Sequence, residues 1–240
     1  RRVYEADYVQ IGVELNNLAV GYDELEMYDE AVPRYREALR IALLRYADDY
    51  EDVRFMRENL ARVISIQGDT AFAEGDYAAA VKLYAEAEQI RTLVGGPDHW
   101  QTVDERLAAA RAKRLLAMTG KQREQYLAAD EQFQQASSLA EEGKHEEALA
   151  AAEAALAEFR AIFGEEERYV PKCLNETAIH LSSLERYDEA LDRYQQAERL
   201  FRRLLGDNHL EIPINLGNVG NLLVSMGKPD EAIEKFRHVV

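Results

Sequence analysis

The sequence has a single cysteine, Cys173, among its 240 residues. One thiol excludes an intrachain disulfide and any zinc site built from several cysteines. Cys173 lies near the start of an expected helix, and no histidine motif accompanies it. We therefore expect a buried structural thiol rather than a nucleophile.

Motifs for catalysis and metal binding are also missing. Gly120-Lys121 and Gly227-Lys228 lack both the upstream glycine and the following Ser/Thr of a phosphate-binding loop, and His145-Glu146 is not followed by a second histidine at HExxH spacing. The acidic run at residues 48–52 lacks EF-hand spacing and is read as a solvated loop. The five histidines fit no ligand set. We expect no enzyme, no cofactor and no metal within these residues.

Basic residues and long apolar runs are scarce. The chain has 29 Lys and Arg against 45 Asp and Glu, a net charge of −16, and no apolar stretch of membrane-spanning length. Nucleic acids and anionic membranes are bound by basic patches, so both are disfavoured as partners. We expect a cytoplasmic location. The charge favours a basic partner segment, or it serves solubility alone.

Glycine and proline are few, with 13 and 5 residues, and runs of β-branched residues are absent, which indicates an all-α chain. Residues 15–39 show how it is organised. Leu15, Leu18, Ala19 and Tyr22 follow the spacing of one helix face, and Ala31, Tyr35 and Ala38 follow that of a second helix. The intervening DELEMYD has no apolar stripe and predicts a turn. Together these features predict an antiparallel helix hairpin.

The same pattern returns along the chain. The alanine that follows each turn marks the copies: Ala31, Ala80, Ala148, Ala190 and Ala232. The last two steps, from Ala148 to Ala190 and from Ala190 to Ala232, are 42 residues each, whereas the first two are 49 and 68. A hairpin cannot bury its apolar stripe alone, so neighbouring hairpins must stack. We predict an α-solenoid of about five hairpins.

The spacing and residue types resemble the tetratricopeptide repeat, and the 42-residue period resembles the variant found in kinesin light chains. LNNLA at 15–19 and EAVPRYREAL at 30–39 look like that subfamily's first- and second-helix signatures. GPDH at 96–99 and GDNH at 206–209 look like its inter-repeat loop, and GEEE at 164–167 departs from it. The resemblance implies a right-handed superhelix of stacked hairpins.

Three regions are expected. Residues 1–99 form a first block of about two repeats and the tail of an earlier one, residues 100–127 form an irregular helical connector, and residues 128–240 form a second block of about three repeats, the last truncated. Within 100–142, TGK at 119–121 is read as a helix stop between two helices. This region is either an irregular hairpin that can kink the superhelix or a repeat whose motif residues have drifted.

Neither end has the polar cap that a solenoid needs. Residues 1–14 fit a loop and the approach to a first helix, with residues 1–4 as the tail of an earlier one. The last helix ends at residue 240, earlier than its counterpart in the preceding repeat. We expect a fragment of a longer chain or a trimmed chain, and disorder at the ends is the alternative. Self-association through the uncapped ends or the irregular region at 100–142 is a separate hypothesis.

Each first helix also has a second stripe that packing leaves free to vary. In the resembled family this stripe lines a concave groove that binds extended or helical peptides. The residues carried over to it are Asn16, Val20, Asp23, Arg62, Asp69, Phe72, Asn175, Ile179, Ser182, Asn221 and Val224. The asparagine amides can hold a peptide backbone, or they are simply solvated. Asn17 and Asn218, one step from the buried stripe, are expected to brace neighbouring helices.

These features predict a protein-interaction scaffold whose groove binds a peptide or helical segment of a partner. In relatives, such repeats accompany kinases, proteases and transcription regulators. A regulatory or sensory region of such a protein, with catalysis outside these residues, is therefore the first alternative. A self-assembly module is the second.

Overall fold

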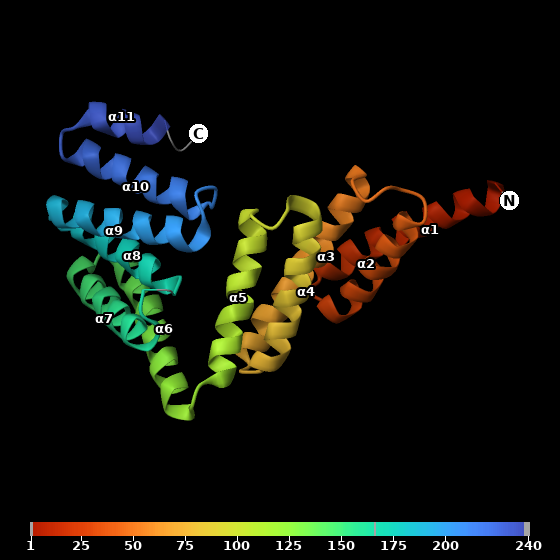
Figure 1. The fold of residues 1–240 in the computed structure, drawn as a ribbon, viewed down its shortest axis with the longest axis horizontal. Helices are drawn as coiled ribbons and strands as arrows, with labels where there is room; N and C mark the ends of the chain where they lie inside the picture. The colour runs from red at the N-terminus through yellow and green to blue at the C-terminus, as the bar shows by residue number, and fades with distance from the viewer. Residues whose placement is uncertain (1, 166, 238–240) are drawn as a thin grey trace. The chain divides into compact units, whose positions relative to one another are not determined.

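The computed structural model describes residues 2–165 and 167–237, with side chains from residue 10 onward. In these ranges the chain is helical and contains no strand, so the all-α prediction is confirmed (Figure 1). The helices are α1 (Arg2–Glu24), α2 (Tyr28–Leu43), α3 (Glu51–Ala73), α4 (Tyr77–Gly95), α5 (Trp100–Ala117), α6 (Gly120–Glu141), α7 (His145–Phe163), α8 (Tyr169–Ser183), α9 (Tyr187–Leu205), α10 (Glu211–Ser225) and α11 (Pro229–Arg237).

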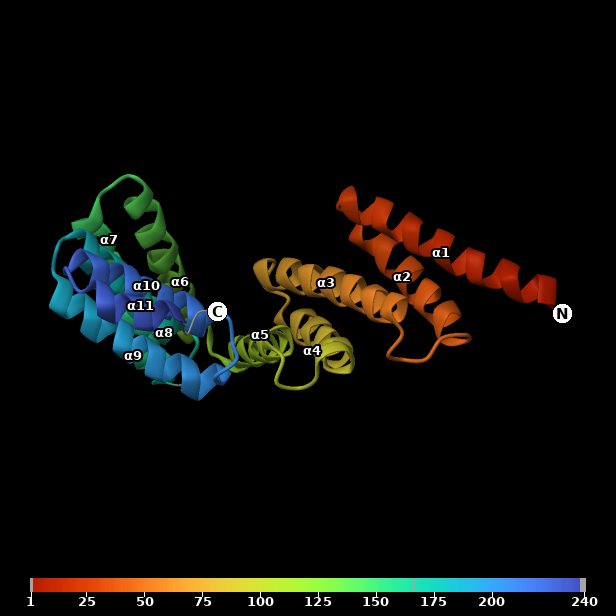
Figure 2. The ribbon, with the colours of Figure 1, turned by 90° about the horizontal axis from the view of Figure 1, so that it is seen from above.

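The chain forms two compact units, residues 1–117 and 118–240. In the first unit, α1 pairs with α2 and α3 with α4, and α5 packs on α4. In the second unit, the hairpins are α6/α7, α8/α9 and α10/α11, and successive hairpins stack (Figures 1 and 2). The predicted solenoid of stacked hairpins is confirmed within each unit.

The division between the units lies inside the segment predicted as a connector. Residues 100–117 form α5 and belong to the first unit, whereas residues 120–127 begin α6, which pairs with α7 as the first helix of a regular hairpin. The additional helix α5 accounts for the long step between Ala80 and Ala148. Thr119 begins α6 with a capping box, in which its side chain and that of Gln122 each accept a bond from the other's backbone N–H. The TGK sequence therefore also starts a helix.

Two expectations for the first helix are wrong. The loop expected in residues 1–14 is absent from residue 2 onward, because α1 continues unbroken to Glu24 through a sequence without proline. Residue 1 and residues 238–240 lie outside the described residues. Leu18, assigned to the buried stripe, is 48% exposed. Its counterparts Thr177 and Val219 are buried, on first helices that stack on a preceding hairpin.

The core follows the small-and-large pattern of the sequence. The five marker alanines are buried, and Tyr35 and Tyr84 fill the space beside them in the first unit. Each tyrosine hydroxyl donates to a carboxylate of its own hairpin, from Tyr35 to Asp23 over 3.3 Å and from Tyr84 to Asp69 over 2.6 Å. Burial and the neighbouring Asp23 raise the pKa of Tyr35 to about 12. The tyrosines thus fasten the first helix to the second.

Candidate functional site

On α3, the predicted site residues Arg62, Asp69 and Phe72 lie on one side of the helix together with Ser65, at intervals of three and four residues. Arg62 and Asp69 are exposed, and Ser65 and Phe72 are half-buried. We call this side of α1, α3 and α5 the first-helix face.

The face is joined across helices by charged and polar contacts. A guanidinium N–H of Arg62 on α3 donates to the Asp23 carboxylate on α1, which also accepts from the Tyr35 hydroxyl. Two predicted site residues from different helices are therefore in direct contact. The Asp23 carboxylate is therefore held by both Arg62 and Tyr35. The Arg62 side chain remains about half exposed.

Glu105 on α5 is a part of this face that the sequence prediction missed. It is 5% exposed, and its carboxylate accepts from the Ser65 hydroxyl over 3.1 Å and from Arg91 Nε over 3.0 Å. Burial raises the pKa of Glu105, and the bonds from Ser65 and Arg91 oppose that rise. Because α5 lies outside the regular repeat pattern, the spacing argument gave it no site residues.

Phe72 also has a partner on α5. The Arg111 guanidinium lies over the Phe72 ring at 4.0 Å from its centroid, and Tyr77 packs edge-on against the same ring at 5.2 Å. A cation held over an aromatic face at this distance is attracted by the ring's quadrupole. Arg111 therefore covers much of the apolar surface that Phe72 was expected to offer.

The two remaining site residues of the first unit lie on α1 and are less accessible. Asn16 is 9% exposed, and Val20 is half-buried against the core formed by Ala19, Tyr35 and Leu60. The exposed predicted residues in this unit are thus Arg62 and Asp69.

In the second unit, Asn175 on α8 binds the neighbouring helix. Its side-chain oxygen accepts from the amides of Asn215 over 3.2 Å and Asn218 over 3.3 Å, both on α10. The predicted bracing role of Asn218 is confirmed. Because both bonds use its side-chain oxygen, the main role of the Asn175 amide is to join α8 to α10 of the next repeat.

Glu176 on α8 lies beside Asn175 and faces α6, where Ser137 donates to it over 3.2 Å. Burial raises the pKa of the Glu176 carboxyl, and the bond from Ser137 opposes the rise. Unlike Glu105, it has no ion pair with a described residue, so its charge is less compensated.

The other predicted residues of this unit differ in exposure. Ile179 is half-buried against the hydrophobic core, and Ser182 is half-buried near the end of α8. Asn221 and Val224 on α10 are exposed, and Ile214 lies on the same side of the helix and is 55% exposed. The accessible part of the site in this unit is therefore the α10 stripe.

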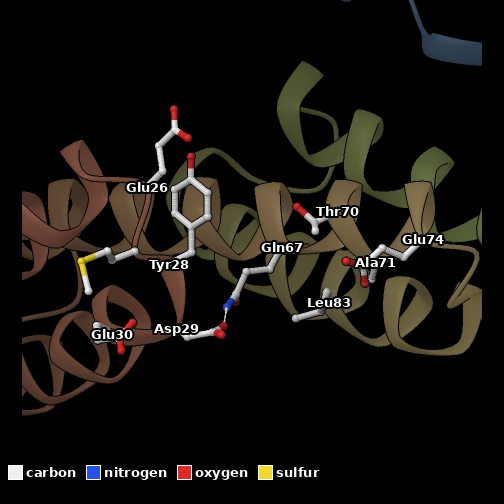
Figure 3. Close-up of a pocket in the computed structure, with 10 residues that line it drawn as sticks. Glu26, Tyr28, Asp29, Glu30, Gln67, Thr70, Ala71, Glu74 and Leu83 are labelled. Atoms are coloured by element: carbon white, nitrogen blue, oxygen red, sulfur yellow. Dashed lines mark hydrogen bonds between the residues drawn. The ribbon is translucent and has the colours of Figure 1, made fainter.

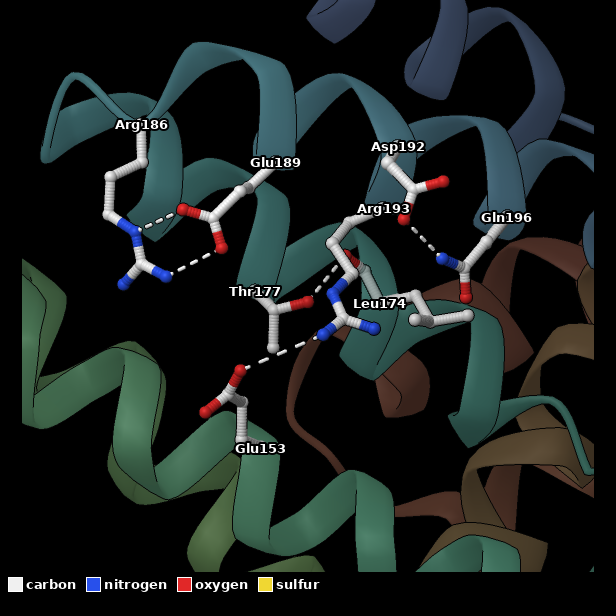
Figure 4. A network of polar contacts seen from close by, with 8 residues as sticks. All are labelled: Glu153, Leu174, Thr177, Arg186, Glu189, Asp192, Arg193 and Gln196. Atoms are coloured by element: carbon white, nitrogen blue, oxygen red, sulfur yellow. Dashed lines mark hydrogen bonds and ion pairs between the residues drawn. The ribbon is translucent and has the colours of Figure 1, made fainter.

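The second helices carry polar side chains that pair among themselves. Arg186 donates two hydrogen bonds of 2.7 Å to Glu189, and Gln196 donates to Asp192 over 2.6 Å along α9 (Figure 4). Arg193 reaches Glu153 on α7 at 3.9 Å. This surface supplies matched controls for the first-helix face.

Metal binding, membrane insertion and thiol chemistry are the other candidate activities of the described residues. No group of three or more His, Cys, Asp or Glu side chains there could hold a metal ion. None of the helices in the described ranges is both long and apolar enough to cross a membrane. Cys173 is fully buried, as predicted, and burial raises its pKa to about 12. A thiol in this state is a poor nucleophile.

Comparisons with known proteins agree with the hairpin architecture. Two family models, both described as tetratricopeptide repeat, match residues 14–52 in one case and residues 135–203 and 173–240 in the other, which together make up more than half of the chain. No curated protein matches the chain.

Several solved structures match nearly the whole chain at low sequence identity. BtubC (BKLC) from P. vanneervenii is 18% identical, with 100% of this chain and 83% of that chain covered and a TM-score of 0.38. The TPR-like repeats of a Podosopora anserina kinesin light chain are 16% identical, with 97% and 94% covered and a TM-score of 0.37. A Rap protein complexed with Competence and Sporulation Factor is 14% identical, with 100% and 76% covered and a TM-score of 0.46.

The family assignment rests on the sequence models and on the repeat pattern that runs through both units. The fold is that of a repeat scaffold, which is generally non-catalytic. The chain belongs to the tetratricopeptide repeat family, and its 42-residue repeats resemble those of kinesin light chains.

Proposed function

We propose that this chain is a protein-interaction scaffold that binds a peptide or helical segment of a partner at the first-helix face of the first unit, and that the α10 stripe of the second unit is a separate binding site of the same kind. The observation that supports this most is exposure on the first helices: Arg62, Asp69, Asn221 and Val224 are all exposed, although Arg62 also bonds to Asp23 and Asp69 also accepts from Tyr84. Tetratricopeptide repeat proteins generally bind proteins or peptides. In this proposal the chain acts in the cytoplasm and has no catalytic activity of its own.

The structure sharpens which residues we propose as contacts. Arg62 and Asp69 offer charges of both signs, and Asn221 and Val224 offer an amide beside an apolar side chain. Asn16 and Asn175 move to a supporting role, because one is nearly buried and the other bonds to α10. The net charge of −16 favours a partner segment with basic residues.

The test uses peptides selected on the chain itself. Peptides from a random library are selected on the immobilised chain, and their affinities are measured by fluorescence anisotropy. We expect Arg62→Ala to weaken peptides bound at the first-helix face, and Asn221→Ala to weaken peptides bound at the α10 stripe, each by about tenfold, or about 1.4 kcal/mol. Arg193→Ala removes the same kind of side chain from the second-helix surface and should leave affinity unchanged.

Circular dichroism first establishes that the variants fold like the parent. Equal binding by all first-helix variants, or equal loss in Arg193→Ala, would place recognition elsewhere and overturn the proposed face. Light scattering across concentrations tests the proposed self-association through the ends, because a monomer at all concentrations rules it out.

A further inference from the structure

We call the contact between one hairpin and the first helix of the next hairpin a seam. The positions along each seam can be matched between repeats. In each first helix, a small residue lies twelve positions before the marker alanine: Gly68 in α3, Ala178 in α8 and Gly220 in α10. Three positions after it the chain has Ala71, Leu181 and Leu223. Two positions after it the chain has Thr70, His180 and Leu222.

In the second unit these side chains close both seams. Leu181, Leu222 and Leu223 are buried in one core cluster, and Leu184 and Met226, at the next matched position, pack against it. His180 is 1% exposed and faces the His145 ring, with centroids 6.1 Å apart. In this unit, side chains of the first helices α8 and α10 therefore fill the space between consecutive hairpins.

The first unit leaves the matching space open. A cavity of about 460 Å³ lies between the α1–α2 turn and the end of α3, within the range of roughly 300–1,000 Å³ typical of ligand pockets. Its lining is shown in Figure 3. The short side chains of Thr70 and Ala71 line it at the positions where the other seams have His or Leu, and we attribute the cavity to this difference in side-chain size.

The cavity combines apolar walls with a negative rim. Met27, Tyr28, Ala71 and Leu83 supply the walls, and the carboxylates are those of Glu26, Asp29, Glu30 and Glu74. Gln67 donates to Asp29 over 2.7 Å and so holds one carboxylate from the α3 side. The ten lining residues include no lysine, arginine or histidine. Among the described residues, Glu26, Glu30 and Glu74 make no ion pair, so the negative charge at this rim is not neutralised.

The lining indicates what the cavity would bind. Among the described residues these carboxylates form no cluster that could hold a metal ion. A long side chain with an apolar stem and a cationic head could place the stem against Met27 and Leu83 and the head among the carboxylates. The Tyr28 ring could add a cation–π contact.

We propose that this seam cavity is a binding pocket for a lysine or arginine side chain of a partner peptide. By helical geometry, its α3 residues Gln67, Thr70, Ala71 and Glu74 lie on the opposite side of α3 from Arg62 and Asp69. The pocket is therefore a second site, independent of the proposed peptide-binding face.

The test observes the pocket directly by methyl NMR. The whole chain, labelled at methionine and leucine methyl groups, is titrated with the peptide acetyl-Ala-Ala-Arg-Ala-Ala-amide and with its citrulline counterpart, which is neutral and has nearly the same shape. We expect saturable shifts of the Met27 and Leu83 methyl signals with the arginine peptide. We expect no saturable shift with the citrulline peptide.

Two kinds of variant sharpen the result. Ala71→Leu and Thr70→Leu each copy the closed seams of the second unit, and either should abolish the shifts while the chain keeps its helicity. Glu74→Gln or Glu26→Gln should weaken binding by roughly twofold to fivefold, as for an exposed ion pair. Glu185→Gln is the matched control, because Glu185 occupies the same turn position as Glu26 beside a closed seam.

Equal shifts with the citrulline peptide would show that charge is not read and would overturn the proposal. Shifts that persist in a folded cavity-filling variant, or that never appear with the arginine peptide, would also overturn it. None of these outcomes bears on the first-helix face or the α10 stripe, which are tested by Arg62→Ala and Asn221→Ala.

Discussion

The seam between the first two hairpins and the seam between the last two follow one repeat pattern but differ in how they are filled. In the last seam, Leu222 and Leu223 are 2% and 3% exposed, whereas their counterparts Thr70 and Ala71 line a cavity. Both of these first helices also keep a small residue, Gly68 or Gly220, which lies against Tyr84 or Phe236 of its own hairpin and lets the two helices of that hairpin approach. The difference shows that close helix approach and seam filling are set by separate positions, so a repeat can keep its fold while opening a pocket.

The largest expected effect comes from opening the closed seam. Leu223→Ala should destabilise the second unit by about 2–5 kcal/mol, because it removes buried methyl groups and leaves a cavity. Trp100 is the one tryptophan and lies in the first unit, so its fluorescence follows that unit while circular dichroism follows both. We expect urea unfolding to shift in the dichroism signal and to stay unchanged in fluorescence. Equal shifts in both signals would mean that the units unfold together.

The paired glycines should respond differently to an added methyl group. In Gly68→Ala the new Cβ would lie 2.8 Å from the Tyr84 ring, which is buried and held by its bond to Asp69. We expect a loss of about 1–3 kcal/mol from this overpacking. In Gly220→Ala the contact is with Phe236, which is 36% exposed, so we expect its ring to turn toward solvent and the loss to be under about 1 kcal/mol. Thermal unfolding of both variants checks the order, and a larger loss for Gly220→Ala would contradict it.

The hairpin turns offer a smaller effect in both units. The residue five positions before each marker alanine has a positive φ; it is glycine in three hairpins and glutamate in two, Glu26 at 57° and Glu185 at 59°. A left-handed conformation costs a non-glycine residue about 1–2 kcal/mol, so Glu26→Gly and Glu185→Gly should each gain about 0.5–1 kcal/mol after the entropy of the unfolded glycine is included. Gly143→Glu is the reverse control and should lose about 1 kcal/mol. Urea midpoints that move the other way would contradict the strain at these turns.

The smallest effect depends on pH and distinguishes Glu176, which is half-buried, from Glu105, which is buried. Burial raises the pKa of Glu176 above its usual 4.5, so its folded state binds the proton more tightly, and stability falls as pH rises through the folded pKa. Glu176→Gln cannot ionise. We expect it to be more stable than the parent at neutral pH by less than about 1 kcal/mol and to lose that advantage in acid.

We expect Glu105→Gln to be less stable than the parent at neutral pH, because it removes the ion-pair partner of Arg91, whose side chain is 11% exposed. Urea unfolding at neutral and acid pH measures both variants. A pH-independent gain in Glu176→Gln would show that the carboxylate is not disfavoured by burial.

Much of the fold followed from residue spacing. Helix faces, turns and repeats could be read from positions such as Ala31, Tyr35 and Ala80, because periodicity of 3.6 residues and the need for small side chains at crossings are local rules. The site was harder to read. The pattern pointed to Asp23 and Arg62 as members of one face but not to their contact, and it omitted Glu105 and Arg111, whose helix lies outside the repeat pattern.

The sequence by itself determined the all-α class, the hairpin unit, the family and the absence of a multi-cysteine site, since each depends on residue types at fixed intervals. Only the tertiary structure decided that Asn175 binds α10, that Arg111 covers Phe72 and that Thr70 and Ala71 leave a cavity. These outcomes depend on which side chains meet across helices that are distant in the sequence. Such contacts arise when hairpins stack, and no single helix encodes them.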